Sequence, residues 1–160
     1  LDYFAETMDK LSKTDFSRVK ILIMEHGTND YNAGRPLDNP EDKYDTTTYG
    51  GAMRKSLHLL KEAYPDLRII VVSPLYCALG DNHEKKCYNT KYGDGGFLEE
   101  YVALEMQIAK DFNVEFLDAY HESGIWEENA SEYLVDYLHL NANGHKLMGD
   151  FIAEYLQNNP

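Results

Sequence analysis

Apolar residues along this chain follow two alternating patterns: short continuous runs, and longer stretches in which they recur every three or four positions. The short runs are rich in β-branched residues and have the length of buried strands, and they occupy positions 19–24, 67–72 and 114–117. The longer spacing is typical of helices that bury one face. It predicts helices at 2–12, at 49–64 after a cap at Thr47 or Thr48, at 97–112, and after the capping residue Asn141.

This alternation predicts the fold class. Strands separated by helices of this length form a parallel sheet with helices on both faces. We therefore expect a single three-layer α/β/α, flavodoxin-like domain over residues 1–160, without an internal repeat or a linker. The remaining segments are predicted loops, with one helical turn near Trp126, and they span 31–46, 75–96 and 119–138.

Charge and hydropathy exclude two classes of partner. The net charge of −13 at pH 7 argues against nucleic acid, because phosphate binding needs a basic surface. No apolar run approaches the roughly 18 residues that a membrane-spanning helix needs. The acidic residues of loop 31–46 fit no EF-hand spacing, so we interpret them as a solvated loop and expect no metal or organic cofactor. These residues are Asp38, Glu41, Asp42 and Asp45.

Two cysteines, Cys77 and Cys87, lie ten positions apart in the predicted loop 75–96. They form either a disulfide that closes a short loop or two free thiols, and both states fit the sequence. His83 lies between them, but three candidate ligands are too few for a zinc site, which needs four. Three tyrosines in the same loop form either an aromatic wall for a sugar or acyl group or the packing of the loop on itself: Tyr76, Tyr88 and Tyr92.

Polar residues follow each predicted strand. Asn29 comes after the first strand, Ser73 after the second, and Asp136 with His139 after the third. The carboxyl ends of parallel strands meet at one edge of a sheet, which is where ligands bind in open α/β sheets. These side chains can therefore converge although more than a hundred positions separate Asn29 from His139.

The segment Asp136-Tyr137-Leu138-His139 places a carboxylate and an imidazole three positions apart. In a helical or turn-like segment this spacing brings both to one side. The carboxylate can then accept a hydrogen bond from one ring nitrogen and leave the other nitrogen as a general base. Asp-x-x-His alone also fits a purely structural polar pair. The position of residues 136–139 after the last strand strengthens the catalytic interpretation.

The segment Gly27-Thr28-Asn29-Asp30 is a tight polar turn at the end of the first strand. We interpret Asn29 as its chemically important residue, and Gly27, Asp30 and the preceding His26 as residues that line the site. The alternative is a turn in which Asn tolerates an unusual backbone angle, with a His26 side chain that bonds to a loop.

Together and in this order, the two segments resemble the SGNH, or GDSL-type, hydrolases. Residues 27–30 resemble the Gly-x-Asn-Asp block of that family, and residues 136–139 resemble its Asp-x-x-His block. The run from His139 to Gly144 continues like His-Pro-Asn-x-x-Gly, with Leu140 in place of Pro. The resemblance implies that the Asn29 amide is an oxyanion donor, that His139 is the general base, and that Asp136 orients it.

One part of the family pattern is missing from this sequence. The nucleophile of the family is the Ser of a Gly-Asp-Ser block after the first strand, and a second block adds an oxyanion Gly. Ser73 lies at the right edge of the predicted sheet, but Pro74 follows it, so we expect it to line the site rather than to act as nucleophile. None of the serines lies in a Gly-Asp-Ser block; they are Ser12, Ser17, Ser56, Ser73, Ser123 and Ser131.

The resemblance therefore implies that the chain is the C-terminal two-thirds of a hydrolase domain, without its first strand. That strand would pair with residues 19–24, which otherwise keep an exposed edge and uncovered apolar faces. We expect the chain to belong to a longer protein or to pair with a second copy, for example as a homodimer. An isolated monomer with this edge open would contradict that expectation.

The function that we expect is ester hydrolysis by a Ser-His-Asp mechanism on a small ester, such as an acyl ester or an acetylated sugar. The chain alone is predicted to be inactive, since it lacks the nucleophile. One alternative is a degenerate, non-catalytic hydrolase domain that binds glycans or a partner. A second alternative is a flavodoxin-like binding domain unrelated to hydrolysis.

Overall fold

The computed structural model describes residues 10, 11 and 13–160, so the predicted helix 2–12 lies almost wholly outside the described residues. The main sheet has three parallel strands in the order β1-β2-β5. In register, Met24 of β1 pairs with Val71 of β2, which pairs with Phe116 of β5. These strands are β1 (Ile21–Glu25), β2 (Arg68–Val72) and β5 (Glu115–Leu117), and their positions confirm the predicted parallel sheet.

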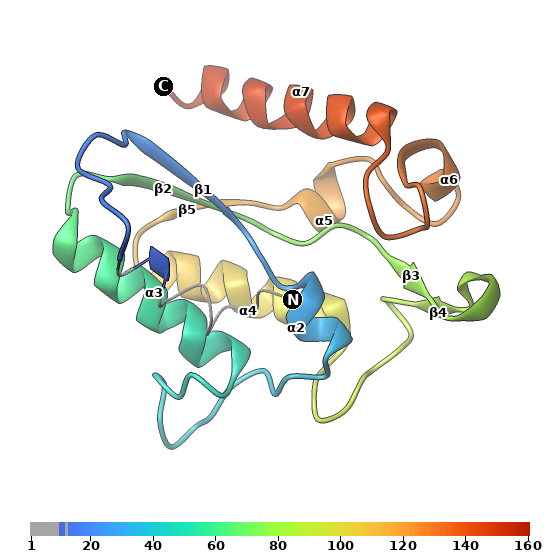
Figure 1. Ribbon diagram of the computed structural model, residues 1–160, viewed down its shortest axis with the longest axis horizontal. Coiled ribbons are helices and arrows are strands. Elements are labelled where there is room, and N and C mark those ends of the chain that lie inside the picture. The colour runs from blue at the N-terminus through green and yellow to red at the C-terminus, as the bar shows by residue number, and fades with distance from the viewer. Residues whose placement is uncertain (1–9, 12) are drawn as a thin grey trace.

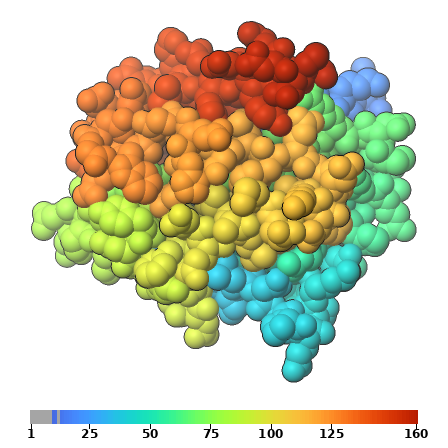
Figure 2. Space-filling model, turned by 180° about the vertical axis from the view of Figure 1, so that it is seen from behind, coloured from blue at the N-terminus to red at the C-terminus, as the bar shows by residue number. Residues whose placement is uncertain are grey.

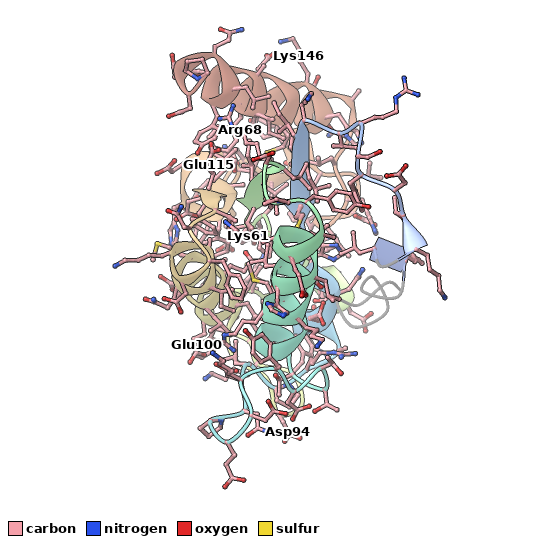
Figure 3. The ribbon with its side chains drawn as sticks, turned by 90° about the vertical axis from the view of Figure 1, so that its left-hand side faces the viewer. Lys61, Arg68, Asp94, Glu100, Glu115 and Lys146 are labelled. Atoms are coloured by element: carbon pink, nitrogen blue, oxygen red, sulfur yellow. The ribbon has the colours of Figure 1, made fainter. Side chains whose placement is uncertain are left out.

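Helices cover both faces of this sheet, which confirms the three-layer arrangement. The helices α3 (Tyr49–Ala63) and α4 (Leu98–Asp111) lie on one side, and α7 (Ala142–Asn158) lies on the other (Figures 1 and 3). Among the described residues, no helix is both long and apolar enough to cross a membrane.

The predicted helix starts depend on side-chain caps. The Thr48 hydroxyl accepts a hydrogen bond from the Gly51 amide at the start of α3. The Asn141 side chain accepts from the amides of Asn143 and Gly144 at the start of α7. Each cap satisfies backbone donors that the first helical turn leaves without a partner.

The central strand and the far end of α7 are fixed by different interactions. Residues 69–72 of β2 are at most 2% exposed, as expected for a strand between two helical layers. At the end of the sheet, Arg68 forms a two-pronged ion pair with Glu115 at 2.7 and 2.8 Å (both labelled in Figure 3). Tyr155 of α7 donates to the same carboxylate at 3.0 Å. These bonds join β2, β5 and α7.

The first strand is the open edge of the sheet. β1 pairs only with β2 in the described chain, and its outward residues Ile21 and Ile23 are 40% and 39% exposed. Met24, on the other face, is buried against the core. An edge strand with exposed apolar side chains is able to pair with a further segment.

The segments predicted as loops hold short elements that the periodicity did not reveal. Because they are only two to five residues long, they show no hydrophobic period. The helical turn predicted near Trp126 is wrong in position, since helices flank that residue on both sides. The additional elements are α2 (Thr28–Asn32), β3 (Ala78–Leu79), the 3₁₀ helix η1 (Asp81–His83), β4 (Lys85–Lys86), α5 (Ala119–Glu122) and α6 (Ala130–Tyr133).

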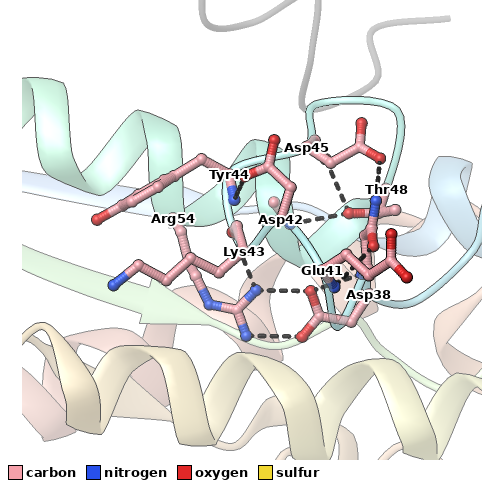
Figure 4. Close-up of polar contacts among 10 residues, drawn as sticks. Asp38, Glu41, Asp42, Lys43, Tyr44, Asp45, Thr48 and Arg54 are labelled. Atoms are coloured by element: carbon pink, nitrogen blue, oxygen red, sulfur yellow. Dashed lines mark hydrogen bonds and ion pairs between the residues drawn. The ribbon is translucent and has the colours of Figure 1, made fainter.

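Carboxylates of the acidic loop 38–45 bond to α3 and to the backbone that follows the loop (Figure 4). Asp38 accepts both guanidinium prongs of Arg54 at 2.7 and 2.8 Å, and the Asp45 side chain accepts from the Thr47 amide at 2.9 Å. The loop projects from one end of the molecule (cyan in Figure 2). Over the described residues, no group of three or more His, Cys, Asp or Glu side chains could hold a metal ion.

Two long loops cross each other at a pair of glycines. Gly34 has φ 65°, and a Cβ atom there would lie 2.4 Å from the carbonyl carbon of Tyr92. The Asp94 amide donates to the Gly34 carbonyl at 3.2 Å, which joins the loop after α2 to the loop before α4. This crossing needs glycine because a side chain would occupy the space of the other backbone.

Candidate active site

The segment that contains Asp136 and His139 is a closed loop between α6 and α7. Leu134 and Leu140 form an antiparallel bridge at its base, and the Val135 amide donates to the His139 carbonyl at 2.8 Å. Tyr137, at the tip, has φ 60°. Its carbonyl accepts from the Ala78 amide at 2.8 Å, so the β3–β4 hairpin holds the tip of the loop.

Within this loop, Asp136 and His139 form the pair that the spacing predicts. One carboxylate oxygen of Asp136 accepts from the amides of Leu138 and His139 at 3.1 and 2.8 Å, and the other lies 2.8 Å from Nδ1 of His139. These bonds, the His139 amide above all, lower the pKa of Asp136 to about 2. The carboxylate thus orients the imidazole, whose side chain is 73% exposed.

Asn29 lies on the one-turn helix α2, directly after β1. Gly27 precedes this helix with φ 116°, a conformation that suits glycine, and its carbonyl accepts from the Tyr31 amide at 2.8 Å. The Asn29 side chain is exposed, and it lines a cavity of about 300 Å³ together with Gly27 and His26. Asn29, Gly27 and His26 therefore line the same cavity.

His139 lines a second cavity of about 270 Å³, and this cavity adjoins the first. Glu25 and Thr28 line both of them, so they form the wall between Asn29 and His139. Asn29 and His139 therefore lie on neighbouring cavities at the carboxyl end of β1, which is the convergence that a parallel sheet predicts.

Two residues predicted to line the site do not do so. Ser73 is fully buried, where its hydroxyl accepts from the Tyr120 amide at 2.9 Å and donates to the Pro74 carbonyl at 3.3 Å. Asp30 is also buried, and its carboxylate lies 3.1 Å from Nε of Arg35. The prediction that Ser73 and Asp30 line the site is therefore wrong, because both side chains point into the protein and bond to neighbouring segments.

Sequence reasoning assigned no role to two lining residues of the second cavity, Thr28 and His145. Thr28 lies within the predicted turn, and His145 lies in the first turn of α7; Glu25, at the end of β1, also lines this cavity. Loss of surrounding water raises the pKa of Glu25, and the charge of the nearby His145 opposes that effect. The available signal was the position of His145 in the first turn of the predicted helix that Asn141 caps, six residues after His139.

The cysteines and tyrosines of loop 75–96 are packing residues in the structure. Cys77 and Cys87 are free thiols and both are buried. Tyr76 and Tyr88 contact Trp126 with ring centroids 5.2 and 5.6 Å apart, so the predicted aromatic wall packs largely on itself. Tyr76 and Cys77 also line the His139 cavity.

Comparison with known proteins places the chain in a family. Residues 3–147 match the model of the GDSL-like lipase/acylhydrolase family. No curated protein matches the chain.

Three solved structures have a similar fold. A structural-genomics protein from Lactobacillus plantarum is 25% identical with a TM-score of 0.78, and the match covers 88% of this chain and 68% of that one. A possible lipase from Chitinophaga pinensis is 16% identical with a TM-score of 0.72, covering 98% and 79%. A peptidoglycan O-acetylesterase is 16% identical with a TM-score of 0.64, covering 96% and 41%.

The family match excludes a flavodoxin-like domain unrelated to hydrolysis, since it spans nearly the whole chain and includes both predicted blocks. The chain belongs to the GDSL-like lipase/acylhydrolase family.

Proposed function

We propose that this chain supplies the general base, the orienting acid and one oxyanion donor of a Ser-His-Asp ester hydrolase. The observation that supports this most is the pair of adjoining cavities, one lined by Asn29 and the other by His139, with Glu25 and Thr28 common to both. Acyl transfer needs a base and an oxyanion donor on the same substrate carbonyl.

The proposed reaction has two steps. In the first, His139 takes the proton of a serine hydroxyl through its second ring nitrogen, the serine oxygen attacks the ester carbonyl, and the alcohol leaves with that proton. Asp136 stabilises the imidazolium that forms, and the Asn29 amide donates to the carbonyl oxygen as it becomes negative. In the second, His139 takes a proton from water as the water oxygen attacks the acyl carbonyl; the bond to the serine oxygen breaks, His139 returns the proton to that oxygen, and the acid leaves.

The nucleophilic serine is proposed to come from a segment that pairs with β1. No serine of the described residues lines either cavity, and the nearest strand edge is the open side of β1. A strand added there would end beside Asn29 and Glu25. On this proposal the chain is the C-terminal two-thirds of a hydrolase domain, and the segment with the serine belongs to a longer protein. A second copy of this chain would cover the edge of β1 without supplying the nucleophile, because its serines lie in no Gly-Asp-Ser block.

The proposed substrate is a small ester, such as an acyl ester or an acetylated sugar. The peptidoglycan O-acetylesterase of similar fold supports this class, since its name describes removal of an acetyl group from a sugar polymer. The apolar side chains in the His139 cavity suit a short acyl group; they are Leu75, Leu138 and Leu140.

Hydrolysis of p-nitrophenyl acetate tests the proposal. The 160-residue chain should give no turnover that depends on His139, so the wild type and His139→Ala should have equal rates. A longer protein with a Gly-Asp-Ser block roughly 50 to 60 residues upstream should hydrolyse the ester, and lose that activity on His139→Ala. His139-dependent turnover by the chain alone would contradict the proposed source of the serine.

The mass of the chain in solution tests the role of the open edge. Sedimentation should report a dimer, or a complex with the missing segment when both are present. A stable monomer that neither self-associates nor binds that segment would contradict the proposed pairing. If the coding sequence holds no Gly-Asp-Ser block upstream, the alternative function applies, namely a non-catalytic hydrolase domain that binds glycans or a partner.

A further inference from the structure

A fully buried carboxyl group lies behind the turn that presents Asn29. Glu105 of α4 is 0% exposed, and acidic side chains are rarely buried to this degree unless they have a partner. One of its carboxyl oxygens accepts a hydrogen bond from the Tyr49 hydroxyl. The other has no hydrogen-bond partner in the described part of the chain.

Burial, with the help of nearby carboxylates, favours the neutral form of Glu105. Burial raises the pKa of Glu105 well above its ordinary value, the Tyr49 bond opposes this rise, and the carboxylates nearby add to it. Those carboxylates are Glu25 of β1, Asp30 of α2 and Asp118 before α5. A neutral acid is therefore the hydrogen-bonding group in this place.

Tyr49 connects this acid to the turn. It is the first residue of α3 and is fully buried. Its hydroxyl lies 2.9 Å from the position that a Cβ atom on Gly27 would take, and Cγ of Pro74 lies 2.7 Å from the same position. The backbone at Gly27 thus rests directly on the Tyr49 hydroxyl, and no larger residue fits there.

We propose that Tyr49 and Glu105 are positioning residues, which hold the turn at Gly27 so that α2 presents the Asn29 amide to the cavity. Glu105 fixes the Tyr49 hydroxyl, the hydroxyl supports Gly27, and Asn29 follows two residues later. This inference rests on the proposed role of Asn29 as oxyanion donor. It assigns a function to a buried acid that the proposed reaction does not use.

Hydrogen exchange of the Tyr31 amide tests the inference on the chain itself. This amide donates to the Gly27 carbonyl and reports whether the turn is closed. In Tyr49→Phe and in Glu105→Leu, it should exchange roughly tenfold faster, since each loses a hydrogen bond. Glu105→Gln keeps an acceptor of the same shape and should stay within about twofold of the wild type.

Two controls separate positioning from general stability. Amide exchange at Ile70 of the central strand should not change in these variants, because it reports the sheet rather than the turn. Ser56→Ala removes another buried hydroxyl of α3, which donates to the Ala52 carbonyl at 2.9 Å, and should leave Tyr31 unaffected. Equal acceleration at Tyr31 and Ile70, or in Ser56→Ala, would overturn the inference.

A double variant keeps the test decisive if the single ones do not fold. Tyr49→Phe/Glu105→Leu leaves neither group buried without its partner, and such paired apolar replacements are often neutral for stability. It should fold and still show fast exchange at Tyr31, and a wild-type rate there would overturn the inference. This readout is independent of catalysis. If Asn29→Ala left ester hydrolysis unchanged, that result would contradict the proposed function but would not alter the exchange result.

Discussion

The chain holds two Asp-x-x-His segments with nearly the same local geometry. In Asp118–His121, as in Asp136–His139, one carboxylate oxygen accepts the histidine amide, at 3.1 and 2.8 Å respectively, and the other lies 2.8 Å from Nδ1. Their surroundings differ. Nε2 of His121 lies 3.6 Å from Glu99, and Asp118 caps the four-residue helix α5, whereas His139 lines the cavity beside Thr28.

The difference separates what the spacing determines from what the fold adds. Asp-x-x-His is sufficient to form the turn and to orient the ring. A general base also needs its second nitrogen to face a space where a substrate can bind. His121 faces a carboxylate on the neighbouring helix α4, whereas His139 lines a cavity, so of the two we propose His139 as the general base.

The largest difference in activity is expected between variants of the two histidines, measured in the longer protein that contains the serine. His139→Ala should lower kcat/KM for p-nitrophenyl acetate by roughly 10²- to 10⁴-fold, because it removes the general base. The matched variant His121→Ala should stay near the wild-type rate. Equal losses in the two variants would mean that the cavity does not distinguish the two segments.

Asn29 should couple to only one of the two segments. Asn29→Ala should reduce kcat by roughly 10²- to 10³-fold, because the developing oxyanion loses a donor. Combined with His121→Ala, the loss should be the same as for Asn29→Ala alone. Rate measurements on the single and double variants check this, and a further loss on adding His121→Ala would place that histidine in the same reaction.

The two aspartates should resemble each other in stability and differ in catalysis. Asp118→Ala and Asp136→Ala each remove a side chain that accepts backbone amides, so each should lower the free energy of unfolding by about 1 kcal/mol. Only Asp136→Ala should also lower the rate of ester hydrolysis. Urea denaturation and rate measurements test both, and an active Asp136→Ala protein would contradict the orienting role.

The smallest effect is the pH dependence of the two pairs. The folded pKa of Asp136 is lowered to about 2, so its bonds stabilise the fold above the unfolded pKa and are lost as pH falls through about 2. Partial burial lowers the pKa of His121, but Asp118 and Glu99 raise it by more. Its contribution is therefore present below the unfolded pKa and is lost as pH rises through the raised value.

Carbon-13 NMR titration of the Asp136 carboxyl and the His121 ring measures these values. The Asp136 midpoint should lie near 2, and the His121 midpoint should lie above that of an ordinary histidine. An Asp136 midpoint at an ordinary carboxyl value would show that the loop opens in solution.

The sequence was sufficient to predict the elements that are long enough to show a regular spacing of apolar residues. Strands β1, β2 and β5, helices α3, α4 and α7, and the caps Thr48 and Asn141 follow from apolar spacing and local hydrogen bonding. The helix α2 and the β3–β4 hairpin could not be predicted in this way. Each has too few residues for a period, and tertiary contacts such as that between Ala78 and Tyr137 hold the hairpin in place.

The site was predictable where residues close in sequence bond to each other, as Asp136 and His139 do. The inward turn of Ser73 was not predictable, because it depends on Tyr120, which is 47 positions away. The same holds for Glu105, whose partner Tyr49 lies on another helix. The spacing of two residues in the sequence predicts a local turn, but packing against distant residues determines which way a side chain points.

The crossing of the loops at Gly34 and Gly93 has a consequence for protein engineering. The two backbones lie so close that neither loop can be replaced by a longer or bulkier one while the other stays as it is. A chimera with a relative would therefore have to take both segments from the same parent. The segments around residues 34 and 93 form one exchangeable module, although 59 positions separate the two glycines along the chain.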